Sequence, residues 1–197
     1  MIAAAMSLSA PYPWFEVCWY TLALYWLISA FHRKTTKKHE GYIQRMGYIL
    51  IMVVSFWFLF RPETGRYPIL GIEFIPRKLV WAWVAVGITA AGVALAIWAR
   101  WYLGSNWSGV VTLKEGHELI RNGPYRSIRH PIYTGILIAL VGTAVMVGEV
   151  RGLLAVVAAW LSFYIKARRE ESFLSQEFGA AFDEHQRHTG MFLPKFS

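Results

Sequence analysis

The stretch that decides the fold is LVWAWVAVGITAAGVALAIWA, residues 79–99. It contains no Asp, Glu, Lys or Arg, and it lies between Lys78 and Arg100. An α-helix needs about 20 consecutive apolar residues to cross the hydrocarbon core of a bilayer. The sequence therefore predicts a transmembrane helix here, and with it an integral membrane protein.

Four further segments are also free of charged residues, although each is shorter. They reach a spanning length once flanking aromatic and basic side chains are counted, because such side chains lie at the membrane interface. Only 16% of the 197 residues are charged, against about a quarter in soluble domains. We predict an all-α fold with about five transmembrane helices. They fall in residues 17–31, 46–60, 79–99, 131–148 and 152–165.

The last two predicted segments are separated only by Glu149, Val150 and Arg151. So short a connection fits either a tight transmembrane hairpin or a shallower re-entrant one. We favour the hairpin, which leaves open whether residues 131–165 fully span the bilayer.

Basic residues predict the orientation of these helices. With five crossings, residues 32–45, 100–130 and 166–197 share one side, and they hold 15 of the 20 Lys and Arg residues. The positive-inside rule places that side in the cytoplasm. The N-terminus is then outside and the C-terminus cytoplasmic. The net charge of +8 thus indicates topology and contact with anionic lipid, and no nucleic-acid-binding motif accompanies it.

A cluster of polar residues follows the turn Asn122-Gly123-Pro124, in which glycine and proline favour a tight change of direction. Arg129 and His130 stand directly before Pro131, a residue that suits the first turn of a helix. A helix N-terminus attracts anionic groups, and an arginine beside it strengthens that attraction. This end of the fourth segment is therefore a candidate binding site.

A second cluster, Glu170-Glu171, continues the helical pattern of the fifth segment at the cytoplasmic edge. Acidic residues are costly against lipid, so they face protein or water. Adjacent helical positions point about 100° apart. We therefore expect only one of the two to face a site, with the other pairing locally, Glu170 with Lys166 or Glu171 with Arg168.

The two clusters supply a set of motifs: Gly123-Pro124-Tyr125, Arg129-His130-Pro131-x-Tyr133-x-Gly135, Glu170-Glu171 and Phe178-Gly179. Together these motifs resemble the isoprenylcysteine carboxyl methyltransferase family and its relatives among membrane phospholipid methyltransferases. The resemblance covers about residues 100–197, and it implies a helical membrane enzyme that transfers a methyl group from S-adenosylmethionine without a Rossmann domain. The absence of G-x-G-x-x-G after a predicted strand agrees with this.

The resemblance implies a cofactor pocket that faces the cytoplasm. Residues 79–197 would then form a membrane-embedded catalytic core, and residues 1–78 an N-terminal transmembrane hairpin with an external loop. The catalytic residues implied are Arg129, His130, Glu170 and Glu171. The cofactor-binding residues implied are Gly123, Pro124, Tyr125, Arg129, His130, Pro131, Tyr133, Glu170 and Glu171.

The chemistry of these side chains suits that cofactor. Arg129 matches its carboxylate, a glutamate matches its ammonium or ribose hydroxyls, and a tyrosine ring matches adenine or the sulfonium. A carboxylate acceptor needs no general base, whereas an amine must lose a proton, which His130 or a glutamate would take. We expect a lipophilic acceptor, either an isoprenylcysteine-type carboxylate or a phospholipid amine, to enter sideways from the bilayer.

Small residues supply a further pattern on the fourth segment. Gly135, Ala139 and Gly142 share one helical face, which favours close packing against another helix. The same face would also let helices part around a lipid tail. Plain helix packing is the interpretation that we favour.

Two other functions remain open from the sequence. An NADPH-dependent membrane reductase of the sterol-reductase kind carries a similar Arg-His-x-x-Tyr arrangement, but the Glu170-Glu171 pair argues against it. A small transporter or assembly factor is the other alternative, and the few polar residues within the apolar segments argue against a transporter. We predict no metal site, because no H-x-x-x-H pair lies within the apolar segments and the chain has one cysteine.

Overall fold

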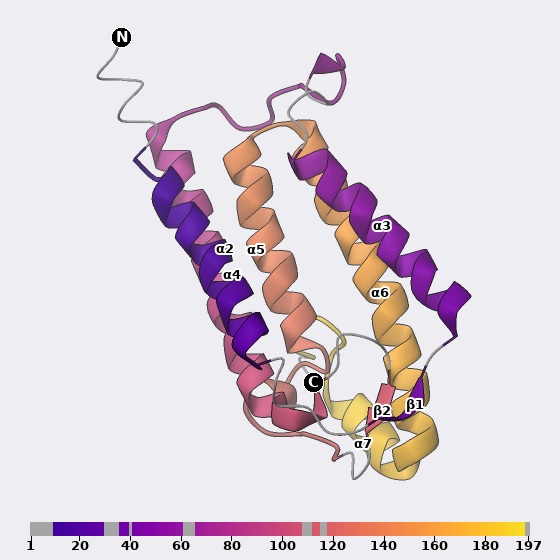
Figure 1. The fold of residues 1–197 in the computed structure, drawn as a ribbon. Helices are drawn as coiled ribbons and strands as arrows, with labels where there is room; N and C mark the ends of the chain where they lie inside the picture. The colour runs from indigo at the N-terminus through magenta and orange to yellow at the C-terminus, as the bar shows by residue number, and fades with distance from the viewer. Residues whose placement is uncertain are drawn as a thin grey trace.

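The computed structural model describes residues 10–29, 36–39, 41–60, 66–107, 112–114 and 118–195. Within these ranges the chain is mainly helical (Figure 1). The elements are α2 (Tyr12–Ser29), β1 (Thr36–His39), α3 (Tyr42–Phe60), α4 (Leu79–Leu103), η2 (Gly104–Asn106), β2 (Thr112–Lys114), η3 (Gly123–Arg126), α5 (Pro131–Val147), α6 (Val150–Phe178) and α7 (Ala180–His188).

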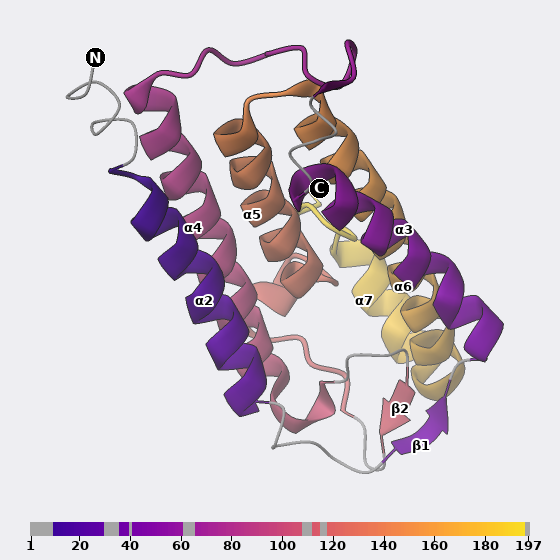
Figure 2. The same ribbon diagram turned by 45° about the horizontal axis from the view of Figure 1, so that its top comes forward.

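Five long helices, α2 to α6, occupy the positions of the five predicted segments. They alternate in direction, so the ends of α2, α4 and α6 lie beside the starts of α3 and α5 and beside α7 (Figures 1 and 2). We call this the site end of the bundle. The starts of α2, α4 and α6 and the ends of α3 and α5 form the far end. The described parts of the three basic stretches therefore border one end of the bundle.

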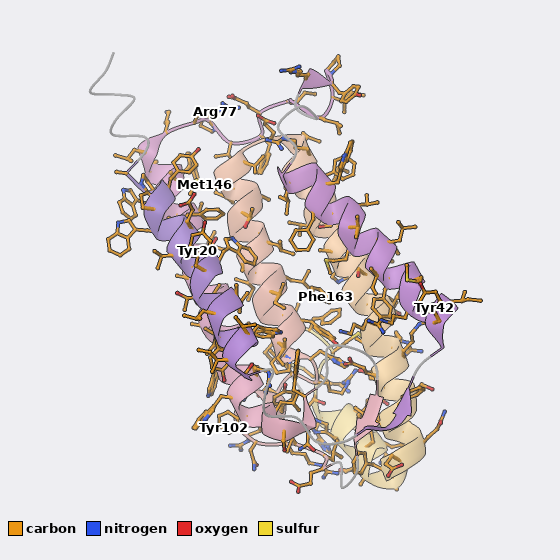
Figure 3. All side chains as sticks on the ribbon, in the orientation of Figure 1. Tyr20, Tyr42, Arg77, Tyr102, Met146 and Phe163 are labelled. Carbon is orange, nitrogen blue, oxygen red and sulfur yellow. The ribbon has the colours of Figure 1, made fainter. Side chains whose placement is uncertain are left out.

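Two helices pass the length and composition test for crossing a membrane, Leu79–Asn106 and Val150–Phe178, among the residues that the structure describes. Arg45–Leu59 and Pro131–Val147 are apolar but shorter. The surface of α2 also carries large apolar side chains, since Tyr20 is 67% and Leu27 64% exposed (Tyr20 is labelled in Figure 3). Water would make such exposure costly, whereas lipid does not.

α4 and α5 pack backbone against backbone, because glycines remove the side chains between them. A Cβ added to Gly92 of α4 would lie 2.4 Å from the Ala139 backbone nitrogen. One added to Gly135 of α5 would lie 2.5 Å from the Ala96 nitrogen, and one at Gly142 2.3 Å from Thr89 Oγ1. The small-residue face thus serves helix packing, which is the interpretation that we favoured.

α3 and α6 are joined by serine hydroxyls that donate to the opposite backbone. Ser55 Oγ donates to the carbonyl of Ala155 at 2.7 Å, and Ser162 Oγ donates to that of Tyr48 at 2.7 Å. In an apolar surrounding a hydroxyl needs such a partner. The polar residues of these segments therefore stabilise the bundle.

α5 and α6 form an antiparallel hairpin through Gly148 and Glu149. Gly148 ends α5 in the left-handed region, with φ of 70°, a conformation that glycine adopts without strain. Glu149 Oε2 accepts from Arg151 Nε at 2.6 Å, and Glu149 Oε1 accepts from Arg77 at 2.6 Å. Arg151 also donates to the carbonyl of Leu59 at 3.2 Å. These bonds fasten the hairpin to α3 and to the residues before α4.

One detail departs from the all-α prediction. β1 and β2 pair antiparallel, with Thr36 opposite Lys114 and His39 opposite Thr112. The two strands come from connections that meet at the site end, where backbone groups outside the helices find partners in each other. Neither strand has an apolar run from which a strand could have been predicted.

Candidate active site

The residues before α5 bend sharply beneath α4. Gly123 has φ of 58°, and a Cβ at this position would lie 2.6 Å from the ring of Tyr102. Glycine is therefore required both for its conformation and for the space it leaves. Pro124 and Tyr125 follow in η3, and both are buried. The turn predicted at Asn-Gly-Pro thus carries Tyr125 into the protein interior.

The chain end fastens the next residues. The backbone nitrogen of Arg129 donates to the carbonyl of Gly190 at 2.9 Å, and that of His130 donates to Met191 at 3.1 Å. Thr134 Oγ1 donates to the carbonyl of Phe192 at 2.7 Å. The segment before α5 is therefore held between α6 and the residues after α7, contacts that the sequence analysis did not foresee.

His130 lies between two carboxylates. Its Nε2 is 3.2 Å from Glu171 Oε1, and its Nδ1 is 3.4 Å from Glu170 Oε2. All three side chains are largely removed from solvent, with Glu171 only 4% exposed. The expectation that only one of the two glutamates would face this cluster is wrong. Neighbours about 100° apart on α6 can both reach one imidazole because its two nitrogens point in different directions.

Glu171 also accepts hydrogen bonds from Arg129 and Gln186. Arg129 Nε donates to Glu171 Oε1 at 2.7 Å, and Gln186 Nε2 donates to Glu171 Oε2 at 3.1 Å. A second nitrogen of Arg129 donates to the carbonyl of Thr189. In this structure Arg129 thus orients Glu171 and ties α7 to the site.

Tyr133 connects Glu170 to the apolar core. Its hydroxyl donates to Glu170 Oε1 at 2.5 Å. The ring stacks on His130, with centroids 5.4 Å apart and planes 4° apart, and on Phe163 of α6 at 4.7 Å (Phe163 is labelled in Figure 3). The ammonium of Lys166 lies 5.2 Å from the Tyr133 ring centroid. The cluster of Arg129, His130, Tyr133, Glu170 and Glu171, here called the histidine cluster, is therefore polar on one side and aromatic on the other.

The surroundings shift two pKa values in ways that matter chemically. Burial alone lowers the pKa of His130, but hydrogen bonds and negative charge from Glu170 and Glu171 outweigh it and raise the pKa above 6.5. Burial raises the pKa of Tyr125 far above its ordinary value, and Glu170 adds to this while Arg100 opposes it. The His130 imidazolium is thus favoured, and Tyr125 keeps its proton.

Arg100 is a buried cation beside this region that the sequence analysis missed. It is 2% exposed, donates to the carbonyls of Ser29 at 2.8 Å and Gly104 at 2.7 Å, and lies 4.5 Å from the Trp107 ring. A basic residue after an apolar run ordinarily lies in the headgroup region. The spacing along the helix was a signal for this burial. Gly92, Ala96 and Arg100 are spaced four residues apart, which places them on the same buried face of α4.

The predicted residues therefore gather at the site end. Direct contacts join five of them: Arg129, His130, Tyr133, Glu170 and Glu171. Tyr125 lies near enough for the charge of Glu170 to raise its pKa. Gly123, Pro124 and Pro131 shape the backbone that presents them. Among the described residues, no group of three or more His, Cys, Asp or Glu side chains could hold a metal ion.

Comparison with known proteins places this site in a family. The model of the phospholipid methyltransferase family matches residues 80–181, a range that includes α5, α6, the whole histidine cluster and all of α4 except Leu79. The chain belongs to this family of membrane methyltransferases.

Several similar curated proteins are named protein-S-isoprenylcysteine O-methyltransferase. The chain is 30% identical to protein-S-isoprenylcysteine O-methyltransferase of Schizosaccharomyces pombe over 66% of this chain and 55% of that protein. It is 29% identical to a probable protein-S-isoprenylcysteine O-methyltransferase of Oryza sativa subsp. indica over 85% of this chain and 87% of that protein.

A solved structure shares the fold. It is a eukaryotic intramembrane Ras methyltransferase, an isoprenylcysteine carboxyl methyltransferase, with a TM-score of 0.57 and 24% identity over 75% of this chain and 52% of that one. The chain therefore spans about half the length of this protein and of the Schizosaccharomyces relative.

Proposed function

We propose that this chain is an integral membrane methyltransferase that transfers a methyl group from S-adenosylmethionine to the carboxylate of a lipophilic, isoprenylcysteine-type acceptor. The family, the names of the relatives and the fold of the solved neighbour support the class of reaction. The single observation that carries the site is the convergence of Glu170 and Glu171 on His130. An alternative acceptor in the same family is a phospholipid amine.

The donor set fits that cofactor. S-adenosylmethionine supplies an activated methyl group on a sulfonium, together with an ammonium, a carboxylate and ribose hydroxyls. Glu170 offers a carboxylate that is 23% exposed, and so it can accept from an ammonium or from hydroxyls. Tyr125 keeps its phenolic proton and can donate. Tyr133 holds Glu170 in place through its hydroxyl.

We assign the residues as follows. Gly123 and Pro124 shape the turn that carries Tyr125, and Pro131 starts the helix that carries Tyr133. Glu170 and Tyr125 contact the bound cofactor. Arg129 holds Glu171, and a carboxylate entering the site would compete with Glu171 for the guanidinium. The imidazolium of His130 keeps the two glutamates together.

Methyl transfer to a carboxylate requires no proton acceptor, so alignment and exclusion of water are the main tasks. Arg100 adds a buried positive charge to the region of Tyr125. Such a charge favours an anionic acceptor over an ammonium. An amine acceptor would in addition need Glu170 or His130 to take its proton.

The topology belongs to the same proposal. Five helices cross the membrane, the N-terminus lies outside and the site end faces the cytoplasm, because the basic stretches border that end. Residues 1–78 would form an N-terminal hairpin with an external loop, and residues 79–197 the catalytic core. The acceptor reaches the site from the bilayer.

Calorimetric titration of the detergent-purified chain tests the cofactor. S-adenosylhomocysteine should bind saturably, and Glu170→Gln should weaken its binding by at least about tenfold, as loss of a charged hydrogen bond predicts. Glu184→Gln, on an exposed part of α7, is the matched control and should bind normally. Saturable binding of NADPH with no binding of S-adenosylhomocysteine would refute the proposal in favour of a reductase.

A second assay tests the acceptor. Transfer of a labelled methyl group should be seen with a farnesylated cysteine derivative that has a free carboxylate. Phosphatidylethanolamine should remain unlabelled. The reverse result would assign a phospholipid amine as the acceptor and refute the carboxylate.

A further inference from the structure

A cavity lies at the far end of the bundle, away from the histidine cluster. Its volume is about 480 Å³, within the range of about 300–1,000 Å³ typical of small-molecule sites. α2 contributes Phe15, α3 contributes Leu59, α4 contributes Trp81 and α5 contributes Met146. Met146 and Arg77 are labelled near this end in Figure 3. α6 adds Arg151, so five helices build a wall that is apolar and aromatic on these four and basic at Arg151.

Basic side chains line the same cavity. Arg77 and Arg151 both bond Glu149 at 2.6 Å, and Arg77 also meets Glu73 at 3.0 Å. Lys78 lines the cavity as well, is exposed, and has no ion pair among the described residues. Three cations thus face two carboxylates, and the surplus positive charge rests on Lys78.

In the topology proposed above, the cavity opens at the depth of lipid headgroups. Tyr12 and Trp81 line it and remain 50% and 39% exposed. Tyrosine and tryptophan concentrate at the membrane–water interface, where one part of the ring is apolar and another is wet. Arg77 and Lys78 directly precede α4 at this level. A ligand here would have an apolar part between the helices and a polar part beside these two cations.

We propose that this cavity binds an anionic phospholipid. Its phosphate lies beside Lys78 and Arg77, and an acyl chain extends along Phe15 and Met146. A zwitterionic lipid brings its own cation and so gains less from the surplus charge at Lys78. The acceptor of the proposed methyl transfer is a different ligand, because about 13 residues of α5 separate Met146 from Tyr133, roughly 20 Å along the helix.

Quenching of tryptophan fluorescence tests this proposal on the full chain in detergent micelles. Phosphatidylglycerol with brominated acyl chains should quench at lower mole fraction than brominated phosphatidylcholine, by about fivefold, the effect of one basic side chain on an anionic headgroup. Trp81→Phe should remove most of the saturable quenching. Equal quenching by the two lipids would overturn the proposal.

Two variants separate charge from shape. Lys78→Gln should reduce the preference for phosphatidylglycerol to less than about twofold, whereas Arg45→Gln, an exposed cation on α3 at the other end, should leave it intact. Ala82→Phe should block both lipids by filling the cavity. An unchanged preference in Lys78→Gln, which alters an exposed side chain and so is expected to fold, is sufficient to refute the proposal.

A third variant distinguishes this site from the candidate active site. Glu171→Gln should leave lipid quenching unchanged and should weaken S-adenosylhomocysteine binding. If quenching by phosphatidylglycerol were lost in Glu171→Gln and kept in Ala82→Phe, the lipid would occupy the histidine cluster, and the far-end site would be refuted without affecting the methyltransferase proposal.

Discussion

The contact between α4 and α5 is close enough that one methyl group should disturb it. In Gly92→Ala the new Cβ would lie 2.4 Å from the Ala139 nitrogen, 2.5 Å from the Gly135 oxygen and 2.9 Å from the Ala139 Cα. All three atoms belong to backbone, so no side-chain rotation relieves the overlap. To reach the 3.4 Å of an ordinary contact, the helices must separate by about 1 Å.

The expected cost follows from two opposing terms. Overpacking of this kind destabilises by about 1–3 kcal/mol, and the upper part of that range applies because backbone must move. Alanine favours the helix over glycine by about 1 kcal/mol. The net effect of Gly92→Ala should therefore be a loss of about 1–2 kcal/mol in the free energy of unfolding.

Gly87→Ala is the matched control, because Gly87 lies on the same helix and a Cβ there meets nothing within 4 Å. It should leave stability unchanged or raise it by up to about 1 kcal/mol. The assay is unfolding of both variants in mixed detergent micelles, followed by circular dichroism and tryptophan fluorescence. A difference of about 2 kcal/mol is expected between them. Equal stability of the two variants would refute the backbone contact between α4 and α5.

Three further predictions concern other parts of the molecule. The pKa of His130 is raised, so its charge contributes stability that is fully present below about pH 6.5 and is lost as pH rises through the raised pKa. In a pH series of unfolding experiments, His130→Gln should abolish this decline. An identical decline in the variant would contradict the assignment. Ser55→Ala should lower the free energy of unfolding by about 0.6–1 kcal/mol, because the hydroxyl is buried and bonded to a carbonyl of α6. Unchanged stability in the same unfolding assay would contradict this. Glu149→Gln should lower the free energy of unfolding by about 3 kcal/mol, because it leaves the buried Arg151 without its carboxylate. The control Glu73→Gln, which changes the exposed partner of Arg77, should lower it by less than about 1 kcal/mol. Equal losses in the two variants would argue against the buried pair.

Much of the fold follows from local composition. An apolar run without charges has to satisfy its own backbone hydrogen bonds, and a helix does this within the segment. The positions of the five long helices could therefore be predicted before any contact was known. The packing role of Gly135 and Gly142 was also readable, because small residues at helical spacing allow close approach.

The site was only partly readable. The sequence by itself determined which side chains are suited to the chemistry: the turn at Gly123, the pair Arg129-His130 and the glutamates one turn beyond the fifth segment. Their grouping at one end also followed, because alternating helices bring these positions to the same edge of the membrane.

Tertiary structure decided how those side chains are arranged. Both Glu170 and Glu171 meet His130, Arg129 is held by Glu171 and by Thr189 directly after α7, and Arg100 is buried instead of reaching the headgroups. Each of these outcomes depends on contacts between elements 40 or more residues apart. Periodicity assigns a residue to a helical face, but the partner that faces it is set by how the helices cross and by where the chain end returns.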